Sequence, residues 1–276
     1  MKTVLRFSER RPLIFVLILL LAWMILVSIV AILVGFLFDK PIVDPLPQSV
    51  GALVATLFLL LGVYRIGWIS QIGVTSFGSP FAWIATLVLF LYIIPAGFYA
   101  FFGESSFQVS SLLDQEAWPI LLRGLRAGLV EEVVFRGVIL YSLVRIWGKK
   151  NRGIVMALMV QAVLFALPHA FQVLAGVTPT SALSNVLATF IFGLWTGILV
   201  VAVGSLWPTI FLHAVSNSLT LIKGLSSTWI APYHLGYLRG ALVELPLVLI
   251  GLWIVLKLKD NQKEVPEKLS EPSVSA

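Results

Sequence analysis

The sequence contains no cysteine among its 276 residues. Disulfide bonds, thiol nucleophiles, Cys-ligated zinc and prenylation of this chain itself are therefore excluded. Charged residues are also scarce, at 12% of the chain, whereas soluble domains contain about a quarter. Hydrophobic residues make up 59%, and the mean hydropathy is +1.00. This composition predicts an integral membrane protein.

Long apolar runs predict how the chain is organised, because each helical span takes roughly 20 apolar residues. They indicate an all-α fold, a polytopic membrane bundle of about eight transmembrane helices. Residues 1–116 are expected to form about three N-terminal spans, residues 117–258 a core that holds the polar motifs, and residues 259–276 a disordered cytoplasmic tail. The predicted spans lie near 13–37, 50–67, 81–102, 118–146, 153–173, 183–204, 207–223 and 240–258.

The positions of the basic residues predict how the protein is oriented. Most Lys and Arg residues precede the first span, follow the last or lie in loops that an eight-span topology places on the same side. By the positive-inside rule this side is cytoplasmic, so both termini are expected there. The membrane would be the plasma membrane in a prokaryote and the endoplasmic reticulum in a eukaryote. The net charge of +6 thus reflects topology, and no nucleic-acid partner is expected.

The stretch "LVEEVVFRGVIL", residues 129–140, places ionisable groups inside an otherwise apolar run. Glu132 and Arg136 are four residues apart, a spacing that lets the guanidinium neutralise this carboxylate. Glu131 points about 100° away and can face something else. Such a pair can be purely structural, but ionisable groups at membrane depth indicate a functional site by default.

Two later spans carry further polar groups. His169 lies in "LFALPH" and shares a helix face with Phe165, and the intervening Pro168 can kink that helix. His213 and Asn217 in "HAVSN" also share a face. Each histidine alone could be a satisfied packing residue. Together with the glutamates on a third span, they predict one shared site.

The types of residue present narrow the chemistry of this site. No Asp falls inside a predicted span, which excludes an aspartyl dyad, and there is neither an H-E-x-x-H helix nor a G-x-S-x-G elbow. What remains is a glutamate general base, histidine, and neutral or cationic donors for an oxyanion. These are the groups that water-mediated acyl transfer needs.

Three motifs resemble those of a known family. The stretch "EEVVFRG" resembles its EExxxR motif, "FALPH" its FxxxH motif and "HAVSN" its HxxxN motif. The family is that of the CAAX-protease and bacteriocin-processing (CPBP, Abi, Rce1-like) intramembrane endopeptidases. The similarity covers roughly residues 117–222, with the motifs in family order, and includes the paired glycines of "FGLWTG" and the turn "GSLWP".

The resemblance implies a multi-pass glutamic-type endopeptidase that hydrolyses a peptide bond in a peptide or membrane-associated protein. Glu131 and His169 would activate the water, and His213 and Asn217 would hold the oxyanion. Glu132, Arg136 and Phe165 would support the site. No cofactor is implied, and the expected partners are the substrate and the lipid bilayer. Prenylated proteins, bacteriocin leaders, peptide pheromones and lipoproteins are equally open as substrates, and no oligomeric state is favoured.

Three alternatives stay open. The first is a zinc-dependent intramembrane protease with Glu131, His169 and His213 as ligands, since two His and one Glu form a common catalytic zinc set. The second is a non-catalytic membrane scaffold or immunity protein that regulates a partner such as a sensor kinase. The third is a transporter with a buried ion pair, which the nearly unbroken apolar character of the other spans disfavours.

Overall fold

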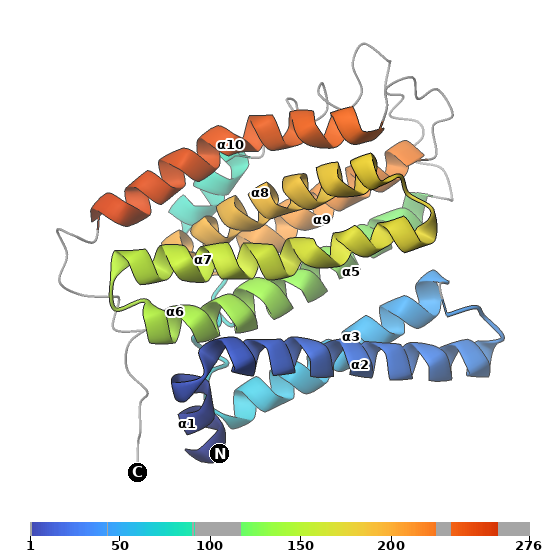
Figure 1. Ribbon diagram of the computed structural model, residues 1–276, viewed down its shortest axis with the longest axis horizontal. Coiled ribbons are helices and arrows are strands. Elements are labelled where there is room, and N and C mark those ends of the chain that lie inside the picture. The colour runs from blue at the N-terminus through green and yellow to red at the C-terminus, as the bar shows by residue number, and fades with distance from the viewer. Residues whose placement is uncertain (1, 43, 90, 92–116, 225–232, 259–276) are drawn as a thin grey trace.

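The structure is a computed structural model and describes residues 2–42, 44–89, 91, 117–224 and 233–258. Every regular element within these ranges is a helix (Figure 1), which confirms the predicted all-α fold. The predicted disordered tail, residues 259–276, lies outside the described residues, as do residues 92–102 of the third predicted span.

The N-terminal region contributes a pair of long helices. Asp44 caps the second of them, because its carboxylate accepts a hydrogen bond from the backbone N–H of Leu46 at 2.9 Å. The two helices pack closely at Gly51, where a Cβ atom would lie 2.5 Å from the carbonyl oxygen of Val27. The elements are α1 (Lys2–Arg10), α2 (Pro12–Phe38) and α3 (Pro45–Arg65).

The core is a bundle of helices that lie roughly along one another (Figure 1). In this bundle α5 lies beside α9, α7 beside α8, and α8 beside α10. A π-helical segment, η2, and a 3₁₀ segment, η3, continue α5 and α7. The elements are α5 (Ala117–Glu131), η2 (Glu132–Leu140), α6 (Tyr141–Trp147), α7 (Asn151–Ala166), η3 (Leu167–Ala175), α8 (Pro179–Val203), α9 (Trp207–Gly224) and α10 (Tyr233–Leu258).

The loop after α3 fixes the start of α9. The backbone N–H of Leu206 donates to the carbonyl oxygen of Gly73 at 3.0 Å, and the indole N–H of Trp207 donates to that of Val74, also at 3.0 Å. These bonds involve the "GSLWP" turn and give the polar groups at the N-terminus of α9 partners inside the protein. The loop therefore holds the helix that carries the HxxxN motif.

Small residues set the distances between the core helices. The two glycines in "FGLWTG" let α8 approach α7 closely, because Cβ atoms at Gly193 and Gly197 would lie 3.3 Å from Ala162 and 2.9 Å from Leu158 of α7. A second pair, Gly124 and Gly128, lets α5 approach α9. A Cβ atom at Gly128 would lie 2.7 Å from the backbone nitrogen of Ala214.

The contact at Gly128 makes a testable prediction about α5 and α9. In Gly128→Ala the added methyl meets backbone, so the helices must move apart, at a cost of about 1–3 kcal/mol. Better helix propensity offsets about 1 kcal/mol of this. We expect a lower unfolding temperature in detergent and weaker activity, because Glu131 is one turn away. Gly62→Ala is the matched control, since a Cβ atom at Gly62 meets nothing within 4 Å; equal unfolding temperatures would contradict the prediction.

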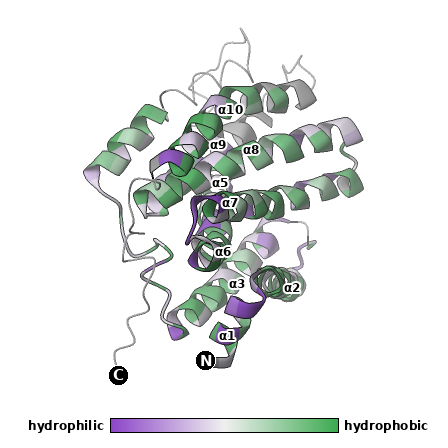
Figure 2. Cartoon of the chain, turned by 60° about the vertical axis from the view of Figure 1, so that its left-hand side comes forward, coloured by the Kyte–Doolittle hydropathy of each residue, from purple (hydrophilic) through white to green (hydrophobic). Residues whose placement is uncertain are grey.

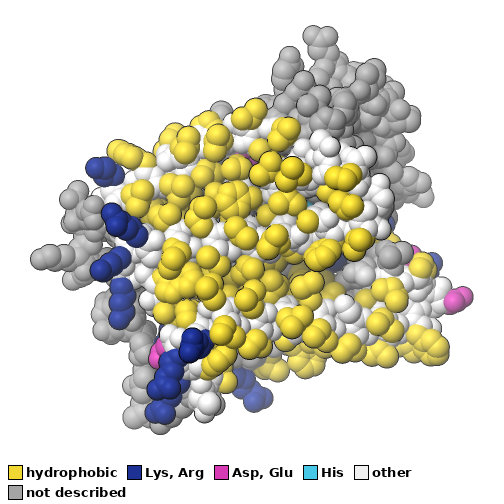
Figure 3. Space-filling view, viewed as in Figure 1, with side chains coloured by type: hydrophobic (Ala, Val, Ile, Leu, Met, Phe, Trp, Pro, Cys, Tyr) yellow, Lys and Arg dark blue, Asp and Glu magenta, His cyan; other side chains and the backbone are white. Residues whose placement is uncertain are grey.

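The surface and the helix lengths indicate how the molecule sits in a bilayer. Among the described residues, five helical segments are long and apolar enough to cross a membrane. Apolar side chains cover most of the face in Figure 3, and the apolar helices are also clear in Figure 2. Lys and Arg gather at one end, near α1 and the α6–α7 connection (Figure 3). The five are Pro12–Phe38, Pro45–Arg65, Asn151–Leu174, Pro179–Val203 and Gly240–Lys257.

Two predicted spans correspond to more polar helices. The span predicted at 118–146 is the continuous run of α5, η2 and α6, in which every residue of η2 is buried. The span predicted at 207–223 is α9, which lies against α5. Both helices thus turn their polar groups into the bundle, as ionisable groups at membrane depth require. The protein is a polytopic, all-helical membrane protein.

Candidate active site

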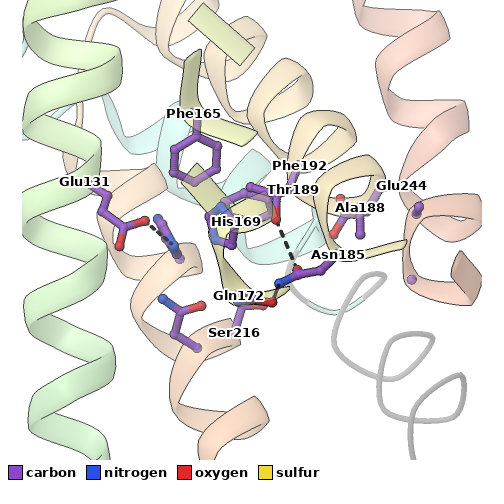
Figure 4. A pocket seen from close by; sticks show the side chains of 14 residues that line it. Glu131, Phe165, His169, Gln172, Asn185, Ala188, Thr189, Phe192, Ser216 and Glu244 are labelled. Carbon is purple, nitrogen blue, oxygen red and sulfur yellow. Dashed lines mark hydrogen bonds and ion pairs between the residues drawn. The ribbon is translucent and has the colours of Figure 1, made fainter. Parts of the chain in front are cut away.

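A cavity of about 350 Å³ opens between the core helices at the motif residues (Figure 4). Residues of α5, α7, η3, α8, α9 and α10 line it. Of the seven predicted site residues, five line it and two lie behind its wall. The five are Glu131, Phe165, His169, His213 and Asn217.

Glu131 and Glu132 are adjacent in sequence but occupy different environments. Glu131 ends α5 and keeps 32% of its side chain accessible, whereas Glu132 begins η2 and is fully buried. The cause is that successive helical residues point about 100° apart. One carboxylate is therefore available in the cavity and the other is enclosed in protein. π-Helical segments such as η2 are often found at functional sites.

The buried carboxylate is held by two partners. Arg136 Nη1 lies 3.1 Å from Glu132 Oε1, which is the ion pair that their spacing predicts. Arg136 Nη2 also donates to Thr196 Oγ1 at 2.8 Å, and its guanidinium carbon lies 4.0 Å from the centre of the Phe165 ring. Both charges are fully buried, so their pairing and these added contacts offset the cost of removing them from water.

His213 joins the two glutamates. Its Nδ1 lies 2.8 Å from Glu132 Oε1 and its Nε2 lies 3.7 Å from Glu131 Oε2. Because the Glu132 carboxylate is ionised by its pairing with Arg136, Nδ1 carries a proton and donates it. Glu132 thereby fixes the ring orientation, and Nε2 faces the cavity carboxylate. The Glu132–His213–Glu131 series is visible in part as the dashed contact from Glu131 in Figure 4.

Phe165 separates the polar groups of this site. Its ring centre lies 5.9 Å from that of His169 and 5.9 Å from that of His213, with the guanidinium of Arg136 above one face. His169 follows one turn later in η3, where Pro168 lies at the change from α-helical to 3₁₀ geometry. The kink expected at Pro168 is thus a tightening of the helix, and it directs His169 toward the cavity (Figure 4).

Sequence reasoning missed five polar residues of the cavity, one of which is Ser216 of α9. Glu244 of α10 lies on the side opposite Glu131, and Gln172, Asn185 and Thr189 line the wall between them (Figure 4). A signal for Glu244 existed, because it is the only charged residue between positions 240 and 256. A single carboxylate in a span should be treated as functional by default. No comparable signal marks the four neutral residues.

The metal-ligand geometry of the site is incomplete. Among the described residues, no three His, Asp or Glu side chains are grouped so that they could hold a metal ion. The set Glu131, His169 and His213 considered for zinc is not grouped in this way in the structure.

Comparison with known proteins agrees with the motif resemblance. The family model described as "Type II CAAX prenyl endopeptidase Rce1-like" matches residues 113–219, which hold all three motifs. No curated protein and no solved structure matches the chain. Residues 113–219 are therefore similar to the Rce1-like family of CAAX prenyl endopeptidases, in agreement with the resemblance of the three motifs.

Proposed function

We propose that the protein is a glutamic-type intramembrane endopeptidase. The observation that carries this proposal is the pair formed by Glu131 and His213. An accessible carboxylate and an imidazole nitrogen face each other at 3.7 Å in a cavity, and a buried Glu132–Arg136 ion pair orients the imidazole. The family supports a peptide bond as the target.

The proposed reaction uses the groups around the cavity. Glu131 takes a proton from a water molecule that His169 helps to hold, and the hydroxide attacks the carbonyl carbon of the substrate. The oxyanion that forms accepts hydrogen bonds from Asn217 and from protonated His213. Glu131 then delivers its proton to the leaving nitrogen, the C–N bond breaks, and a carboxylic acid and an amine are released.

The orientation proposed for this enzyme follows from its charge distribution. The end at which Lys and Arg gather (Figure 3) would face the cytoplasm, and by the positive-inside rule both termini would lie on that side. The substrate would be a peptide or membrane-associated protein that reaches the cavity from the bilayer or its surface. The membrane would be the plasma membrane or the endoplasmic reticulum, according to the host.

The test is cleavage of a membrane-peptide library by detergent-purified protein, with and without a zinc chelator. We expect cleavage by wild type that the chelator leaves unchanged, and a loss of roughly 10²-fold or more in His169→Ala, since a positioned proton-transfer group contributes about that much. Loss of cleavage on chelation would favour zinc. Absence of cleavage by protein shown to be folded would favour the scaffold function.

A further inference from the structure

The cavity has two walls with different chemistry. The wall formed by α5 and α9 carries the groups of the proposed reaction, Glu131 and His213. The opposite wall, formed by η3, α8 and α10, carries His169 and also polar groups that the reaction does not use, namely Gln172, Asn185, Thr189 and Glu244 (Figure 4). Polar side chains inside a membrane bundle are costly to keep there. The second wall therefore needs a function of its own.

The neutral part of this wall is already ordered by its own hydrogen bonds. Thr189 Oγ1 donates to Asn185 Oδ1 at 3.3 Å, and Asn185 Nδ2 donates to Gln172 Oε1 at 2.9 Å (Figure 4). Asn185 is only 6% exposed. These two hydrogen bonds hold the three side chains in place, so this wall of the cavity is preorganised before a substrate binds.

Glu244 adds an ionisable carboxyl group to this ordered wall. It lies on α10 next to Gly240 and Ala241, which also line the cavity and are too small to cover the carboxylate. The described side chain with which it interacts is Trp195 of α8, which is neutral. Among the residues that line the cavity there is no Lys or Arg. The Glu244 carboxylate is therefore not neutralised by any of these residues.

The two carboxylates of the cavity differ in this respect. Glu131 has His213 at 3.7 Å, a group that can carry positive charge. Glu244 stands across the cavity from that pair (Figure 4). A cation brought by the substrate would pair with this carboxyl group, for which the residues that line the cavity supply no Lys or Arg, and such an interaction is selective for positive charge.

Building on the proposed function, we propose that Glu244 is a specificity-determining residue that binds a cationic group of the substrate, a primary ammonium or a guanidinium. A cavity of about 350 Å³ admits a short piece of extended chain, in which each residue spans at most about 3.6 Å. The cation must therefore lie within a few residues of the bond that is cut. A Lys or Arg side chain and a free peptide N-terminus supply the same chemistry.

The test measures binding of fluorescent apolar peptides in which one Lys, Gln or Glu is placed at each position in turn, with acetylated and with free N-termini. Glu131→Gln protein in detergent is used, so that cleavage does not interfere. We expect Lys peptides to bind roughly 10- to 100-fold more tightly than Gln peptides at one or two positions. An advantage confined to free N-termini would identify the α-ammonium as the cation.

The decisive variants add Glu244→Gln or Glu244→Lys to the same protein. The first should abolish the preference for Lys, and the second should shift it to Glu peptides. Glu9→Gln is the matched control, because it removes one carboxylate at α1, where Glu9 lies 3.6 Å from Arg145. The inference would be overturned if the preference for Lys peptides survives Glu244→Gln in protein with an unchanged unfolding temperature. It would also be overturned if the protein that still has Glu244 shows no preference for Lys peptides.

Cleavage by the wild type, measured in parallel on the same peptides, separates the two proposals. Cleavage without any preference for a cation would contradict the role proposed for Glu244 and support the endopeptidase activity. Cation-selective binding without cleavage would contradict the endopeptidase activity and support Glu244 as part of a binding site. Where both hold, Glu244→Gln should raise KM for Lys peptides with little change in kcat, because it loses binding and no proton transfer.

Discussion

Replacing Glu131 by Gln is expected to lower kcat by about 10²- to 10⁴-fold, the range that a general base contributes. Gln has nearly the shape of Glu and can still hydrogen-bond water, but its amide cannot take up a proton. KM should change little, because the wall that carries Glu244 remains in place. Initial rates on a cleaved membrane peptide measure both constants.

The exposure of Glu131 lets this substitution change activity without a large change in stability. Its side chain is 32% exposed, so the unfolding temperature of Glu131→Gln should stay near that of the wild type. Glu9→Gln again controls for the loss of one negative charge. A variant that keeps wild-type kcat would rule out Glu131 as the base, and with it the proposed reaction.

The positions of the helices were largely predictable because the bilayer imposes a simple length rule. The span predicted at 13–37 is α2 at Pro12–Phe38, and that at 207–223 is α9 at Trp207–Gly224. The starts of two others were placed late, since α3 begins at Pro45 and α10 at Tyr233. An apolar run marks only the part of a helix that lies in the hydrocarbon of the bilayer. The helix itself can begin earlier, among polar residues at the interface, so its start is predicted too late in the sequence.

The members of the site were predictable in part, and its internal pairing was not. Glu132 and Arg136 could be paired from their spacing alone. The contact of His213 with both glutamates depends on the register of α5 against α9, which is set by close packing at Gly128 and not by any local pattern. Glu244 was not predicted, because no polar residue lies three or four positions from it and only the fold brings it to the cavity.

The buried ion pair leads to the largest stability prediction. In Arg136→Met the fully buried Glu132 carboxylate keeps His213 but loses its guanidinium. Breaking such a pair by removing one partner typically costs about 3–5 kcal/mol. The hydrogen bond to Thr196 and the contact with the Phe165 ring are lost as well. We expect a large drop in unfolding temperature in detergent, together with loss of cleavage.

The double variant Arg136→Met, Glu132→Leu separates stability from function. Removing both charges abolishes the desolvation cost, so the double variant should be more stable than Arg136→Met alone by a few kcal/mol. Activity should not return, because His213 Nδ1 then has no carboxylate to fix the ring toward Glu131. Cleavage that recovers together with the unfolding temperature would show that the pair serves only to hold the fold. Stability without cleavage would show that the enclosed carboxylate is retained to orient His213.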